Sequence, residues 1–278
     1  MKSSNDTSRA RRAAAPLFFS FLLACCAAAS ARQQQPADKT PDKPAPQQAA
    51  AEAPNGKAAP AGKAAPALSP AATPAELARA AYQSLGGDRY RDLRNMVLAG
   101  SLDLYSPAST QGITGRFGVI TAGDKIRQEM QSPFFSASLI YDGVQSYSSM
   151  RGFELPPPAK FGIPVLVKHA QPGYAVTALP EKDSKKARAF RITDPEGNTT
   201  DYKVDAATGK LTGYEIPFGG VTFVVEIKNT KEIEGVTVPV YFVQRLATPQ
   251  GSFIAEFKVK EAKINQELPA DAFAIPAK

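Results

Sequence analysis

Residues 138–149 read SLIYDGVQSYSS, and this stretch places two β-rich runs on either side of Asp142-Gly143. A two-residue hairpin turn of type I′ needs a positive φ at both of its central residues, and an Asp-Gly pair meets this need at low cost. The flanking runs are rich in residues that favour strands. The stretch therefore predicts an antiparallel hairpin closed by a type I′ turn.

Similar turn signals separate β-rich runs at hairpin spacing throughout residues 96–264. They stand at Ala122-Gly123-Asp124, residues 195–198, Thr208-Gly209, Gly219-Gly220, Glu234-Gly235 and residues 249–251. Consecutive hairpins indicate an antiparallel meander, and about ten strands joined in this way curl into a sandwich or a barrel. The spacing does not favour an α/β enzyme, in which strands alternate with helices.

One helix is predicted ahead of these strands. Thr73 as N-cap, Pro74 at the first helical position and Glu76 at the third form a capping box. Gly86-Gly87 is expected to end the helix in the left-handed conformation, and residues 88–94 are expected to form a polar turn. The apolar stripe of this helix consists of Leu77, Ala81 and Leu85.

Residues 1–31 have the parts of a secretory signal peptide: a basic start, an apolar centre and small residues at the end. Two processing sites compete within them. Ala29-Ser30-Ala31 has the small-x-small form that leader peptidase accepts, whereas Leu22-Leu23-Ala24-Cys25 resembles a bacterial lipobox, whose cysteine accepts a diacylglycerol. We expect export to the periplasm, either as a cleaved soluble form or anchored to the outer membrane by a lipidated Cys25.

The signal is followed by a segment without a core pattern. Residues 32–72 are rich in Ala, Pro and Gln and have no apolar period, so they cannot bury enough surface to offset the entropy of ordering. We expect a disordered tether here and the folded domain at residues 73–278. The tether either lets an anchored domain search the space between two membranes or serves as a plain linker.

Charge and cysteine content limit the partners and the sources of stability. The chain carries a net charge of +7, of which residues 1–31 hold +3 and residues 32–72 hold +2. Only +2 remains for residues 73–278, so a nucleic-acid partner is not supported. The two cysteines, Cys25 and Cys26, both lie in the predicted signal. The domain therefore depends on its hydrophobic core and not on a disulfide.

Two features interrupt or limit the β pattern. Residues 153–167, FELPPPAKFGIPVLV, are too proline-rich for a strand and too apolar for a solvated loop; they form either a lid over the barrel mouth or a packed crossover. His169 is the single histidine, with no G-x-S-x-G around any serine, and we expect it in a solvated loop. We predict no catalytic residues, no metal site and no cofactor.

Several motifs, taken in order, resemble the LolA-like family of periplasmic lipoprotein carriers and outer-membrane lipoprotein-sorting proteins. The likeness covers about residues 75–276. It is carried by the helix ahead of the sheet and by five stretches: GRFGV at 115–119, DKIRQE at 124–129, LIYDGVQSY at 139–147, EGVTVP at 234–239 and ELPADAFAIP at 267–276.

The resemblance implies a mainly β (α+β) fold: an unclosed antiparallel β-barrel, or half-barrel, of about eleven strands. The N-terminal helix and a lid segment would lie over its concave face, above an apolar cavity that takes acyl chains. Implied partners are a lipid or an acylated lipoprotein, and a membrane transporter; whether a transporter loads the domain is left open. Where the well-studied carriers have an Arg-Pro pair that gates the lid, this chain has Thr121-Ala122, so no gating arginine is carried over.

If the fold is a half-barrel, the alternation along each strand indicates which apolar side chains face the cavity. Leu77, Ala81 and Leu85 would belong to the lid. The candidate wall of the cavity is Leu98, Leu102, Leu104, Phe117, Val119, Ile126, Met130, Phe223, Val225, Phe242 and Phe257. Two functions fit this set: a non-catalytic carrier or acceptor with an open cavity, and a regulatory or structural module that senses or docks a membrane partner with the cavity filled by its own side chains.

Overall fold

The computed structural model describes residues 68–109, 111–151, 153–180, 186–249 and 251–276. The predicted signal with Cys25, and residues 32–67 of the predicted tether, lie outside these ranges. The helices are α1 (Pro74–Ser84), α2 (Asp88–Arg91), η1 (Pro158–Lys160) and α3 (Ile163–Val167). The strands are β1 (Met96–Tyr105), β2 (Ile113–Ala122), β3 (Lys125–Gln131), β4 (Ser136–Tyr141), β5 (Ser146–Ser148), β6 (Ala175–Ala178), β7 (Ala187–Thr193), β8 (Thr199–Asp205), β9 (Leu211–Phe218), β10 (Val221–Ile233), β11 (Val236–Thr248) and β12 (Gly251–Ile264).

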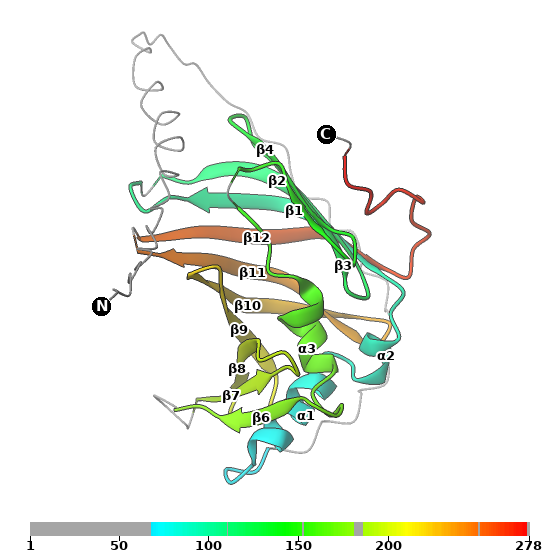
Figure 1. Ribbon diagram of the computed structural model, residues 1–278, viewed down its shortest axis with the longest axis vertical. Helices are drawn as coiled ribbons and strands as arrows, with labels where there is room; N and C mark the ends of the chain where they lie inside the picture. The colour runs from blue at the N-terminus through cyan, green and yellow to red at the C-terminus, as the bar shows by residue number, and fades with distance from the viewer. Residues whose placement is uncertain (1–67, 110, 152, 181–185, 250, 277–278) are drawn as a thin grey trace, which may run out of the picture. The chain divides into compact units, whose positions relative to one another are not determined.

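All the strands of the described residues belong to one antiparallel sheet of twelve strands (Figure 1). Its order is β5-β4-β3-β2-β1-β12-β11-β10-β9-β8-β7-β6, so each hairpin pairs consecutive strands and only the β1–β12 pair joins strands far apart in the chain. The sheet stays unclosed, with β5 and β6 at its two edges. This confirms the mainly β, unclosed antiparallel fold, with twelve strands where about eleven were expected.

The predicted turns lie between the strands, but the type I′ geometry occurs elsewhere than expected. Gly219-Gly220 and Glu234-Gly235 have a positive φ at both residues and join directly paired strand ends. At Asp142-Gly143 only the glycine has a positive φ. The Asp142 carboxylate instead accepts hydrogen bonds from the backbone N–H groups of Val144 and Gln145, both at 2.8 Å. The prediction of a type I′ turn here is wrong, because this carboxylate organises a longer loop.

Helix α1 forms as predicted. Thr73 caps it, its Oγ1 accepting from the Glu76 N–H while the Glu76 carboxylate accepts from the Thr73 N–H at 2.7 Å. Gly86 and Gly87 follow with positive φ. The polar turn expected at residues 88–94 is only partly correct, because Asp88–Arg91 form the short helix α2.

Residues just before α1 also pack on the domain. The Leu68 N–H donates to the Ala207 carbonyl at 2.9 Å. The Arg188 guanidinium donates to the carbonyls of Pro70 and Ala72, at 3.1 and 3.2 Å. These contacts fix the direction in which the chain enters α1.

The hydrophobic core consists of two clusters. The first, which we call the helix cluster, joins buried side chains of α1 and α3 to strands β7, β8 and β9, with Leu77, Leu166, Phe190 and Tyr202 among them. The second, the aromatic cluster, joins side chains of β1, β2, β11 and β12. Figure 1 shows α1 and α3 beside the β6–β9 part of the sheet. Among the described helices, none is long and apolar enough to span a membrane.

The sheet order explains the apolar segment at residues 153–167. This segment, the crossover, must lead from β5 at one edge to β6 at the other. It carries η1 and α3, and α3 inserts Val165 and Leu166 into the helix cluster. The crossover is therefore packed against the domain, which agrees with the packed-crossover interpretation of this segment.

The packing of α3 predicts a stability difference. Leu166 is completely buried, whereas Val144 in the β4–β5 loop is 89% exposed. We expect Leu166→Ala to lower the free energy of unfolding by about 2–5 kcal/mol because it leaves a cavity, and Val144→Ala to change it by less than about 0.5 kcal/mol. Urea unfolding of the purified protein measures both. Equal effects would contradict a buried α3.

Candidate functional site

Strand register places the eleven predicted wall residues on one face of the sheet. Leu98 pairs with Val119, Leu102 with Phe257, and Phe257 with Phe242. Directly paired residues point to the same face, and so do residues two apart along a strand. The same reasoning from the β2–β3 and β10–β11 pairs adds Met130, Ile126, Phe223 and Val225. We call this the inner face.

The helices cover one part of the inner face. Tyr202 of β8 points to this side and donates through its hydroxyl to the Gly162 carbonyl, at the start of α3, at 2.7 Å. The predicted lid residues Leu77, Ala81 and Leu85 are all buried in the helix cluster. This part of the inner face is therefore filled by the protein's own side chains.

Eight of the eleven predicted residues come together in or against the aromatic cluster. Its centre is three phenylalanines: Phe242 stacks on Phe257 with ring centroids 4.7 Å apart, and Phe117 meets Phe257 edge-on at 4.9 Å. Leu98 and Leu102 are buried with them, and Leu104, Val119 and Met130 pack against them half-buried. Edge-to-face and offset aromatic contacts add stability beyond the area they bury, so this cluster is well packed against itself.

Three predicted residues lie outside both clusters. Ile126 pairs with Tyr141 on the β3–β4 side of the sheet. Val225 pairs with Tyr214 of β9. Phe223 is half-buried, and its ring lies 6.0 Å from that of Phe153 in the crossover.

Sequence reasoning did not include two aromatic residues near one end of the inner face among the candidate wall residues. They are Phe153 of the crossover and Phe134 of the β3–β4 turn. The β3–β4 turn, the end of β1 and the start of β2 lie at this end, because Leu104 pairs with Ile113 and Gln131 with Ser136. In this turn Phe134 is 63% exposed, and the Ser132 hydroxyl accepts from the Phe134 N–H at 3.2 Å. Both residues are visible in the sequence as aromatic residues, but neither segment has the alternation of a strand, so no face could be assigned to them.

The crossover is fixed to both sides of the inner face. On the β7–β8 side, Lys160 pairs with Glu196, and the Gly162 N–H donates to Thr200 Oγ1 at 3.2 Å. On the other side, the ammonium of Lys168, the residue that follows the crossover, lies 3.2 Å from the Asp124 carboxylate in the β2–β3 turn. The crossover thus ties together two parts of the sheet that the strand order keeps far apart.

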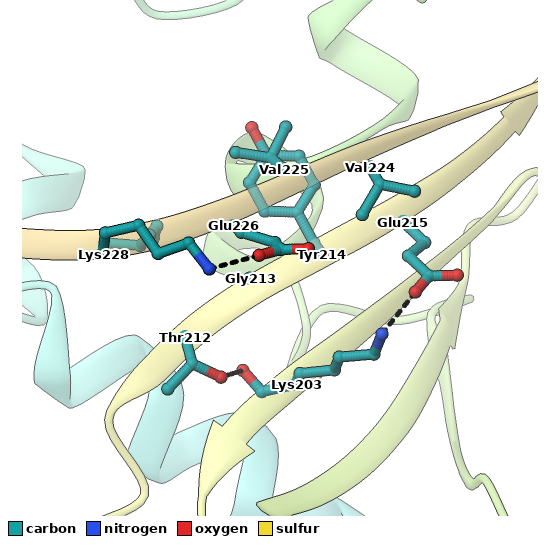
Figure 2. Close-up of a pocket in the computed structure, with 10 residues that line it drawn as sticks. Lys203, Thr212, Gly213, Tyr214, Glu215, Val224, Val225, Glu226 and Lys228 are labelled. Atoms are coloured by element: carbon teal, nitrogen blue, oxygen red, sulfur yellow. Dashed lines mark hydrogen bonds and ion pairs between the residues drawn. The ribbon is translucent and has the colours of Figure 1, made fainter. Parts of the chain in front are cut away.

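Strands β8–β10 carry a groove of about 250 Å³ around Gly213, and the predicted wall residue Val225 and its neighbour Val224 both line it (Figure 2). Ion pairs flank it, Lys203 with Glu215 and Lys228 with Glu226. The Lys228 ammonium lowers the pKa of Glu226. A second, open groove of about 600 Å³ lies beside Tyr105 and Ile254. Neither groove is lined by the phenylalanines of the aromatic cluster.

The single histidine of the chain follows α3. His169 Nδ1 lies 2.8 Å from the Leu166 carbonyl, and its ring centroid lies 5.6 Å from that of Tyr82. The expectation of a solvated loop histidine is only partly correct, because His169 lies in the turn after α3 but is half-buried. Within the described ranges, no three His, Cys, Asp or Glu side chains gather as a metal site would require.

Three solved structures have folds similar to that of this chain, and each of them is matched over nearly its whole length. A LolA superfamily protein from Nitrosomonas europaea is 13% identical, with 74% of this chain and 99% of that one covered and a TM-score of 0.48. A putative outer membrane lipoprotein-sorting protein domain from Vibrio parahaemolyticus is 11% identical, with 71% and 97% covered and a TM-score of 0.44. A DUF1329 family protein from Desulfovibrio piger is 8% identical, with 73% and 98% covered and a TM-score of 0.46.

No protein-family model matches the chain, and no curated protein matches it. The resemblance that the motifs indicated is thus a similarity of structure to LolA superfamily and lipoprotein-sorting proteins. No activity follows from it.

The burial of Tyr214 on the inner face predicts that the stability of the domain depends on pH in the alkaline range. Burial raises the pKa of Tyr214 to about 12, above the ordinary value of 10.0. The folded state therefore holds this proton more tightly than the unfolded chain, and the resulting stability is present below pH 10.0 and lost as the pH rises through about 12. We expect the free energy of unfolding to fall across this range, and Tyr214→Phe to make the fall shallower. Urea unfolding of both proteins tests this, and equal slopes would contradict it.

Proposed function

We propose that this chain is a non-catalytic carrier or acceptor of the cell envelope that binds the acyl chains of lipoproteins or lipids on the inner face of its sheet. The observation that supports this most is the placement of eleven apolar side chains, from strands far apart in sequence, on that one face. Acyl chains bind by leaving water, at about 0.8 kcal/mol per buried methylene. Such binding needs apolar area and no particular polar group.

The half-buried end of the inner face is the proposed point of access. Leu104 and Phe223 keep accessible surface there, and Phe153 of the crossover covers part of Phe223. Phe242 and Phe257 are buried in the aromatic cluster, where their rings pack against each other and against Phe117. An acyl chain that reaches the aromatic cluster must therefore displace the crossover or separate these rings.

The envelope location rests on the sequence. The predicted signal would export the domain to the periplasm. A lipidated Cys25 would anchor it to the outer membrane, with the tether between anchor and domain. A membrane transporter that loads the domain is part of the same proposal.

One observation favours the alternative of a regulatory or structural module. The helix cluster fills the β6–β9 part of the inner face, and the aromatic cluster is packed against itself. In that case the fold would sense or dock a membrane partner through its surface and would hold no acyl chain.

Two adjacent valines give a matched test. Val225 points to the inner face, whereas Val224 is the next residue on the opposite face of β10. A charge buried against an acyl chain is costly, so Val225→Asp should weaken binding of the fluorescent fatty acid cis-parinaric acid by about tenfold or more. Val224→Asp should leave it within about twofold.

Fluorescence titration measures both variants, after circular dichroism shows that each is folded. No saturable binding by the unmodified protein would contradict the carrier function and favour the module. An equal loss in both variants would place the site away from the inner face.

A further inference from the structure

The open groove of about 600 Å³ lies on the face of the sheet opposite to the inner face. Ser252, Ile254 and Glu256 line it and are alternate residues of β12, so their side chains share one face. Glu256 precedes Phe257, which points to the inner face, so this shared face is the other one. Tyr105 pairs directly with Ile254 and points the same way. With residues 106–109 these four side chains form the described lining, which we call the hydroxyl groove.

Close packing of two turns fixes the wall of the hydroxyl groove. Gly251, with a φ of +124°, lies so near the loop after β1 that an added Cβ would come within 2.7 Å of the Pro107 Cβ. Inside that loop the Ser109 N–H donates to the Ser106 carbonyl at 3.2 Å. The wall is therefore formed by the fold itself, as is usual for small-molecule sites.

The Tyr105 ring supplies a flat aromatic surface to this groove. A Cβ added to Gly112 would lie 2.9 Å from Cε1 of Tyr105, so the ring packs directly against this glycine. The Tyr105 side chain is half-buried and keeps accessible surface. Because the face of an aromatic ring carries partial negative charge, it attracts the C–H groups of a ligand that lies flat on it.

Glu256 carries the only charge among the described lining residues of the groove. Its directly paired neighbour Asp103 is neutralised by Lys258, at 3.0 Å. The Glu256 carboxylate instead accepts from the Tyr241 hydroxyl at 3.2 Å, and no described lysine or arginine forms an ion pair with it. A carboxylate has about four acceptor positions, so Glu256 can accept further hydrogen bonds from a ligand.

The lining of the groove selects a class of ligand. Ser106, Ser109 and Ser252 add hydroxyl groups, which both donate and accept hydrogen bonds. An anionic ligand would meet the Glu256 charge with no described cation in the lining to offset it. The volume lies within the range of about 300–1,000 Å³ that is typical of small-molecule sites. A neutral sugar fits these groups, because a pyranose ring has C–H groups on its faces and hydroxyl groups around its edge.

We propose that the hydroxyl groove binds a neutral oligosaccharide, with the Tyr105 ring stacked on one sugar ring and the Glu256 carboxylate accepting hydrogen bonds from its hydroxyl groups. The serine hydroxyls contact the neighbouring sugar units. This site is separate from the proposed acyl site, because its β12 side chains and Tyr105 point away from the inner face. The domain could therefore hold a glycan and an acyl chain at the same time.

Isothermal titration calorimetry with maltotriose, cellotriose and triacetylchitotriose tests the site. We expect the unmodified protein to bind at least one of them with a Kd of about 1 mM or lower. Glu256→Gln should weaken this binding about five- to tenfold, because a neutral amide oxygen accepts less strongly than a carboxylate. Tyr105→Leu should weaken it about three- to tenfold through the loss of stacking. Glu226→Gln, in the groove around Gly213, is the matched control and should change it by less than about twofold.

Circular dichroism first shows that each variant is folded, so a loss of binding reports on the groove. No saturable binding of any of the three sugars overturns the proposal. Equal effects of Glu256→Gln and Glu226→Gln also overturn it, because the sugar would then bind elsewhere. A further titration uses the diamine cadaverine: if it binds through Glu256 while the sugars do not, the groove is a cation site and the neutral class is wrong. Sugar affinity should be the same in about 50 mM and about 500 mM NaCl, because salt screens only charged ligands.

Discussion

The strand order imposes one connection on which the rest of the structure depends. The chain builds outward from β1 to the edge strand β5, and it must then reach β6 at the opposite edge before it can return to β12 beside β1. Residues 153–167 make this passage. The contact of Gly162 with Thr200 on one side, and that of the adjoining Lys168 with Asp124 on the other, show that the passage bridges the inner face. The same passage supplies α3 for the helix cluster, so the topology covers the apolar face and stabilises the fold at once.

Packing and binding compete on that face. The helix cluster and the aromatic cluster give the domain its core in the absence of a disulfide in the described residues. The half-buried side chains near Leu104 and Phe223 are the places where packing is incomplete. A carrier needs both a packed core and an incompletely packed apolar surface, because an apolar face that its own side chains cover completely buries no further area when an acyl chain binds.

Much of the architecture could be predicted because it depends on local patterns. A strand period of two assigned eleven side chains to one face, and glycine turns located the hairpins. What failed depended on contacts that no local pattern encodes. Asp142 accepts two backbone N–H groups and so replaces a type I′ turn with a longer loop, and His169 is half-buried because α1 brings Tyr82 beside it. The sequence also could not predict how much of the inner face is filled by side chains, since this depends on where α1 and α3 pack.

Native mass spectrometry of the protein purified from its own host, followed by organic extraction of whatever is bound, tests the central claim most directly. The account predicts a stoichiometric adduct whose extract contains an acylated molecule, in line with an apolar face that holds acyl chains. A clean mass of the protein alone, unchanged after incubation with phospholipid and lipopeptide, would contradict the claim. The inner face would then be a packed core, and the domain a module that acts through its surface.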